Sequence, residues 1–67
     1  MNWENGSAVS VRMDGETAVI SANREGLLSL AALCAELAEN APGSHYHLDP
    51  YNSLEDDSTE LIIEKIP

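Results

Sequence analysis

An Asp-Gly pair at residues 14–15 separates two runs in which apolar and polar residues alternate. Such a pair favours a two-residue β-hairpin loop, because a type I′ turn needs a positive φ at both central positions. We therefore predict one strand over residues 8–14 and a second over residues 16–22. This loop would place Val11 opposite Ala18, and opposed residues share a face of the hairpin. The face expected to meet the core carries Val9, Val11, Met13, Ala18 and Ile20.

A helix is predicted over residues 24–39, directly after the second strand. Asn23 is a suitable N-cap, since its side-chain oxygen can accept a free backbone N–H of the first turn. Apolar residues recur at three- and four-residue spacing, which is typical of an amphipathic helix packed on a sheet. The stripe expected to face the core consists of Leu27, Leu30, Ala31, Cys34, Leu37 and Ala38. The side expected to face solvent carries Glu25, Ser29, Ala32, Glu36 and Glu39.

Two further strands are predicted over residues 44–49 and 60–66, on either side of a polar loop. Alternation along the first of them places His45, His47 and Asp49 on one face, opposite Tyr46 and Leu48. The predicted fold is therefore an α+β domain of order ββαββ. Its four strands would form one largely antiparallel sheet, with the single helix packed on one face.

The length of 67 residues indicates a single domain over residues 1–67. Residues 1–7 are expected to be a loose lead-in, although Trp3 could dock on the core. Cys34 is the one cysteine, so no internal disulfide can form, and a reducing cytoplasmic location is expected. The N-terminus has no leader-like pattern, and the longest apolar stretch, within residues 27–38, is too short to cross a bilayer. We therefore expect no membrane partner.

The charge balance is strongly acidic, with twelve Asp and Glu residues, three Lys and Arg residues and a net charge of −9. A field of this sign repels phosphate backbones, so we expect no nucleic-acid partner. It would favour a basic protein partner and speed its capture. Alternatively, the acidity serves only to keep a small domain soluble.

The histidine strand raises the question of a metal site. His45 and His47 could ligate one ion, with Asp49 or Glu64 as a third ligand. Histidines spaced in this way are, however, more often surface residues than ligands, and the ligand set is incomplete. Cys34 lies within the apolar stripe of the predicted helix, whereas a nucleophile needs an exposed, electropositive setting. We therefore predict no catalytic residues, no metal and no cofactor, and a metal-binding domain remains an alternative.

One helix covers one side of a sheet, so the opposite sheet face is the expected binding surface. It would carry the predicted partner-contacting residues Arg12, His45, His47 and Asp49, and also Ile62 and Glu64 if Leu61 and Ile63 face the helix. Both faces of the last strand are partly apolar, so Ile62 and Ile66 could face the helix instead. A second candidate surface is the acidic loop, which contains Glu55, Asp56 and Asp57. The open sheet face could instead join two copies into a homodimer without independent activity.

Three segments of the chain resemble a bacterial family, the immunity protein 32 type of polymorphic toxin systems. They are Asn-Arg-Glu-Gly-Leu at residues 23–27, Gly-Ser-His-Tyr-His-Leu-Asp at residues 43–49 and Glu-Leu-Ile-Ile-Glu-Lys at residues 60–65. The resemblance implies a small cytoplasmic α+β protein that binds and neutralises a cognate toxin. It brings no catalytic residues with it. By analogy, the net charge would suit a basic toxin domain.

Overall fold

A computed structural model describes residues 3–67 of the chain. The elements, in order, are β1 (Val9–Asp14), β2 (Thr17–Ala22), α1 (Arg24–Ala38), β3 (His45–Leu48) and β4 (Leu61–Glu64). β1 pairs with β2 and β3 pairs with β4, both antiparallel. The predicted α+β class, the order ββαββ and the antiparallel pairing are confirmed.

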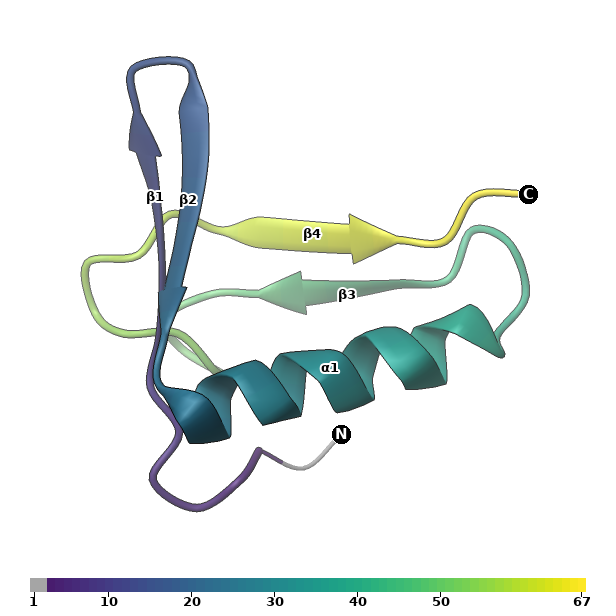
Figure 1. The fold of residues 1–67 in the computed structure, drawn as a ribbon. Helices are drawn as coiled ribbons and strands as arrows, with labels where there is room; N and C mark the ends of the chain where they lie inside the picture. Colours follow the sequence, from purple (N-terminus) through teal and green to yellow (C-terminus); the bar gives the residue numbers. More distant parts are fainter. Residues whose placement is uncertain (1–2) are drawn as a thin grey trace.

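The prediction of one four-stranded sheet is wrong, because the strands form two separate two-stranded sheets. Figure 1 shows the β1–β2 hairpin standing across the direction of β3 and β4. The edge of β1 that could have joined the sheets is bonded to the loop before β4. The Glu55 N–H donates to the Val9 carbonyl at 2.8 Å, and the Thr59 N–H donates to the Val11 carbonyl at 2.7 Å. A loop therefore occupies the edge at which another strand would pair.

The turn of the first hairpin lies one residue later than predicted. Asp14 pairs with Thr17, so the two loop residues are Gly15 and Glu16. Gly15 has a φ of +61°, whereas no residue other than glycine has a positive φ in the described chain. A glycine at the first loop position is typical of a type II′ turn, which replaces the predicted type I′ turn. The strand register is consequently shifted by two residues.

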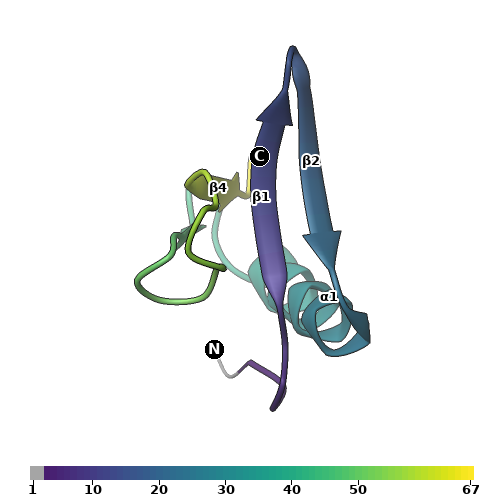
Figure 2. The same ribbon diagram turned by 90° about the vertical axis from the view of Figure 1, so that its left-hand side faces the viewer.

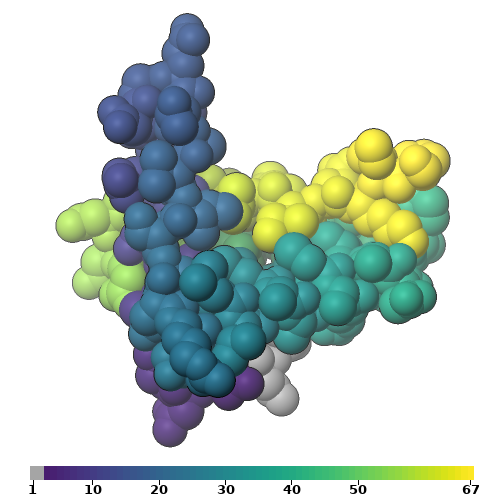
Figure 3. All heavy atoms as spheres, viewed as in Figure 1, coloured from purple at the N-terminus to yellow at the C-terminus, as the bar shows by residue number. Residues whose placement is uncertain are grey.

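A shift of two residues leaves every side chain on its predicted face, because side chains alternate with period two. Val9 and Val11, near the base of the hairpin, are buried as predicted. Met13, Ala18 and Ile20 lie further toward the tip and are exposed, so their assignment to the core was wrong. Their part of the hairpin projects beyond β4, as the space-filling view in Figure 3 shows. The core ends before the hairpin does.

The helix begins as predicted. The Asn23 side-chain oxygen accepts from the Gly26 N–H at 2.8 Å, which confirms the N-cap. The buried face, however, is rotated by about one residue position, or about 100°, from the predicted stripe. Leu27 and Cys34 are exposed, whereas Ser29, assigned to solvent, is buried. The buried residues of α1 are Gly26, Ser29, Leu33 and Leu37.

Two small residues explain the rotation. The Ser29 hydroxyl accepts from the Glu4 N–H at 2.8 Å and donates to the Glu25 carbonyl at 2.9 Å. A serine with both bonds made can be buried without an unsatisfied polar group. Gly26 lies so close to the preceding chain that an added Cβ would be 2.6 Å from the Ala8 carbonyl oxygen. The helix therefore approaches β1 through its small, polar side.

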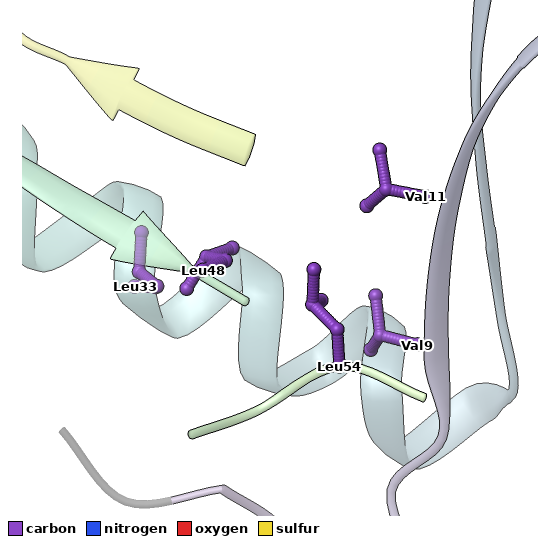
Figure 4. Close-up of a cluster of buried hydrophobic side chains, with 5 residues drawn as sticks. All are labelled: Val9, Val11, Leu33, Leu48 and Leu54. Atoms are coloured by element: carbon purple, nitrogen blue, oxygen red, sulfur yellow. The ribbon is translucent and has the colours of Figure 1, made fainter. Parts of the chain in front are cut away.

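The core joins the two sheets through the helix and one loop. Its buried cluster, drawn in Figure 4, consists of Val9, Val11, Leu33, Leu48 and Leu54. Trp3 packs against this cluster from the N-terminal segment. Leu54 comes from the loop between β3 and β4, which the sequence pattern assigned to solvent. Its burial helps to hold that loop beside β1.

Candidate functional site

Four of the predicted contact residues share the face of the β3–β4 sheet that points away from the core. The register pairs His45 with Glu64 and His47 with Ile62, whereas the alternate residues Leu48, Leu61 and Ile63 pack on the core. The two histidine rings lie 5.9 Å apart between centroids, at an interplanar angle of 63°. The structure therefore brings together His45, His47, Ile62 and Glu64, all exposed.

Asp49 does not extend this row, because β3 ends at Leu48. Its carboxylate accepts from the Tyr51 N–H at 2.8 Å and the Asn52 N–H at 3.1 Å, which closes the turn after the strand. Among residues 3–67, no three His, Cys, Asp or Glu side chains gather in a way that could hold a metal ion. The row of metal ligands proposed from the sequence is therefore not formed in the described chain.

Arg12 lies apart from the histidine face, which is the exposed face of the β3–β4 sheet that carries His45, His47, Ile62 and Glu64. It belongs to the hairpin sheet, where its guanidinium donates to the Ser21 hydroxyl at 2.9 Å. Since the two hairpins form separate sheets, the prediction of one sheet face carrying both Arg12 and His47 is wrong. The binding roles of these residues stay predictions.

The acidic loop is fixed along the outer edge of β1. The Glu55 and Thr59 N–H groups donate to β1, as described above. In addition, the Val11 N–H of β1 donates to the Ser58 hydroxyl of the loop at 3.1 Å. Glu55, Asp56 and Asp57 are all exposed on this loop. The loop therefore presents a fixed group of carboxylates to solvent beside the hairpin.

Little basic charge opposes these carboxylates. The Lys65 ammonium donates to the Ala38 and Asn40 carbonyls at 2.6 and 2.7 Å, where it caps the C-terminus of α1. The one ion pair within residues 3–67 joins Arg24 and Glu25 at 4.0 Å, on the exposed start of the helix. Most of the acidic side chains are therefore left to interact with solvent or with a partner.

Two shallow hollows flank α1. One, of about 230 Å³, is lined by residues that include Trp3, Tyr46 and His47, and the other, of about 190 Å³, lies between α1 and β4 beside Cys34. Cys34 is exposed rather than part of the core, which corrects the sequence-based assignment. Among the described residues, no histidine that could act as a base for Cys34 lines this hollow.

Tyr46 lies on the side of β3 that faces the helix, where it lines the larger hollow. The Glu36 carboxylate accepts a hydrogen bond from the Tyr46 phenol, and this raises the pKa of Tyr46 above its ordinary value. Burial and the charge of Glu36 act in the same direction.

The helix content and the comparisons with known proteins bear on the class of protein. None of the helices in residues 3–67 combines the length and apolar character needed to cross a membrane. No curated protein and no solved structure gives a significant match to the chain. A family model described as Immunity protein 32 matches residues 17–66, which include β2, α1, β3 and β4. Because this match spans well over half of the chain, the protein belongs to the Immunity protein 32 family.

Proposed function

We propose that this protein is a bacterial immunity protein that neutralises a cognate toxin by binding it directly in the cytoplasm. The observation that carries the proposal is the family match over residues 17–66. An immunity protein needs a protein partner, and direct occupation of that partner requires no chemistry of its own. The hollow beside Cys34 has no histidine in its described lining to act as a base, which favours a binding role over catalysis.

The charge distribution supports a basic partner. The net charge is −9, and the acidic loop holds Glu55, Asp56 and Asp57 in solvent. Complementary charge raises association rates and suppresses wrong partners. The histidine face adds an exposed apolar side chain, Ile62, between polar neighbours, as is common in recognition surfaces. Both surfaces remain proposed contacts, with the basic toxin as their proposed occupant.

The experiment first identifies a large secreted protein encoded beside this gene, and then co-expresses this chain with the C-terminal domain of that protein as the candidate toxin domain. Cells that make both proteins are expected to survive, and the purified pair should form a complex in calorimetry and size-exclusion chromatography. Reversing the charges of Glu55, Asp56 and Asp57 to lysine should slow association, most strongly at low salt. A matched control reverses three exposed acids outside this loop, Glu4, Glu16 and Glu39, so that the net charge changes by the same amount.

Two results would count against direct neutralisation. Cells that die despite producing the folded protein would show that it does not protect against that toxin. Survival without any complex between the purified proteins would show that protection works by another route.

A further inference from the structure

The two edges of the β1–β2 hairpin differ in what covers them. The outer edge of β1 is bonded to the loop before β4 at Val9 and Val11. β2 pairs with β1 alone, and no other strand within residues 3–67 lies on its outer side. Figure 2 shows β1 on one side of β2 and no strand on its other side, with α1 below the hairpin. The hairpin therefore has one closed edge and one open edge.

The register identifies the open backbone groups. The Asn23 N–H donates to the Ala8 carbonyl at 3.1 Å, so these two residues form a hydrogen-bonded pair of the ladder. Every second residue of β2 then bonds to β1, and the residues between them direct their N–H and C=O groups outward. The outward residues are Ala18, Ile20 and Ala22.

The open edge lacks the usual protection against pairing. Residues 17–22, Thr-Ala-Val-Ile-Ser-Ala, contain no charged residue and no proline, and their register with β1 runs without a bulge. Natural proteins guard long edge strands with lysine, proline or bulges, because an exposed edge is a template for another strand. An unguarded strand of six residues is therefore suited to receive an extended chain.

Apolar side chains lie where an added strand would cover them. Ile20 on β2 is 46% exposed, and Leu27 in the first turn of α1 is 55% exposed. Leu27 precedes Cys34 by seven residues, which is about two helical turns, so both lie on the side of α1 that borders the hollow beside β4. Figure 3 shows a recess between the projecting hairpin and the rest of the molecule. Alternate side chains of a strand added beside β2 would lie on the same sheet face as Ile20.

We propose that β2 binds an extended segment of the toxin as a third strand of the β1–β2 sheet, an inference that rests on the proposed function. Backbone hydrogen bonds to Ala18 and Ile20 would provide affinity, as in other strand-addition complexes. Alternate apolar side chains of the segment would contact Ile20 and Leu27. The segment carries flanking Lys or Arg residues, because a chain with a net charge of −9 attracts a cationic partner and repels a second copy of itself.

The test uses two proline variants at cross-strand partners. Ala18→Pro removes an outward N–H from the open edge, and proline is tolerated where a strand N–H faces solvent. Met13→Pro removes the outward N–H directly across the hairpin, on β1. Both positions are exposed, so neither change removes a core side chain. With the adjacent-gene toxin domain as probe, Ala18→Pro should weaken binding at least about tenfold, whereas Met13→Pro should change it by less than about threefold.

Amide hydrogen exchange on the unmodified protein gives a second measurement that does not depend on a variant folding. The Ala18 and Ile20 amides should exchange rapidly in the free protein and slow at least about tenfold in the complex. The Met13 amide should keep its free exchange rate. In Ala18→Pro, which has no amide at position 18, a separate comparison should show no protection of the Ile20 amide by the toxin domain.

The outcomes separate this inference from the proposed function. A toxin domain that binds the unmodified protein and Ala18→Pro equally, with no protection at Ala18 and Ile20, overturns strand addition and leaves the immunity function standing. A toxin domain that does not bind the unmodified protein overturns both. If the protein alone sediments as a dimer that Ala18→Pro dissociates, the edge belongs to a second copy, and the toxin-strand proposal is wrong.

Discussion

Replacing Leu33 with alanine tests the observed rotation of α1. Leu33 is fully buried, at 0% exposure, and packs in the cluster with Val9, Val11, Leu48 and Leu54. Truncation of a buried leucine costs about 2–5 kcal/mol, because the transfer free energy is lost and a cavity is left. A chain of 67 residues has a total stability of about 3–10 kcal/mol at typical values per residue. Leu33→Ala should therefore remove a large part of the free energy of unfolding.

Leu27→Ala is the matched control, since it makes the same chemical change in the same helix. Leu27 is 55% exposed, so less apolar area leaves water when the protein folds. Alanine also has the higher helix propensity, which offsets part of the loss. We expect Leu27→Ala to cost less than about 1 kcal/mol.

Urea denaturation followed by far-UV circular dichroism measures both variants. With a denaturant dependence of about 1 kcal/mol per molar for so small a domain, Leu33→Ala should lower the midpoint by about 2 M or more. Leu27→Ala should lower it by less than about 1 M. The apolar stripe predicted from the sequence gives the reverse order, because it includes Leu27 and does not include Leu33. A larger loss for Leu27→Ala would refute the rotated helix.

Two further substitutions test the contacts at the ends of the helix. Gly26→Ala, normally stabilising within a helix, should instead destabilise the protein by about 1–3 kcal/mol, because the new Cβ would lie 2.6 Å from the Ala8 carbonyl oxygen and 2.8 Å from a Val9 methyl carbon. An increase in the urea midpoint would contradict that close approach. Lys65→Met keeps the aliphatic stem but removes both bonds to the helix C-terminus, and should cost about 1 kcal/mol in the same assay. An unchanged midpoint for Lys65→Met would show that this cap contributes nothing.

The local features of the fold could be predicted because each depends on residues close together in sequence. The Asn23 cap needs only the backbone N–H of Gly26, three residues later. The shared face of His45 and His47 follows from strand alternation alone. The side chains of the first hairpin were assigned to the correct faces although the predicted turn type was wrong, because a shift of two residues preserves the alternation.

The remaining features depend on partners distant in sequence. Ser29 is buried because Glu4, far earlier in the chain, satisfies its hydroxyl, and a polar residue in a pattern carries no sign of such a partner. Leu54 is buried although the loop around it is polar and acidic. The separation of the two sheets follows from backbone bonds of that loop to β1. Strand patterns alone give no information about which edge a loop will cover.

These backbone bonds also decide where a partner can be added without displacing part of the fold. β1 is held on both sides, by β2 and by the loop, and it contributes Val9 and Val11 to the core although it lies before the residues matched to the family model. β2 lies within the matched residues and is held on one side only. A strand added at β1 would have to break the bonds to Glu55 and Thr59, whereas a strand added at β2 would break none of the bonds that order the hairpin. Adding a strand at β2 therefore costs fewer backbone hydrogen bonds than adding one at β1, which favours β2 as the edge at which the hairpin binds another chain.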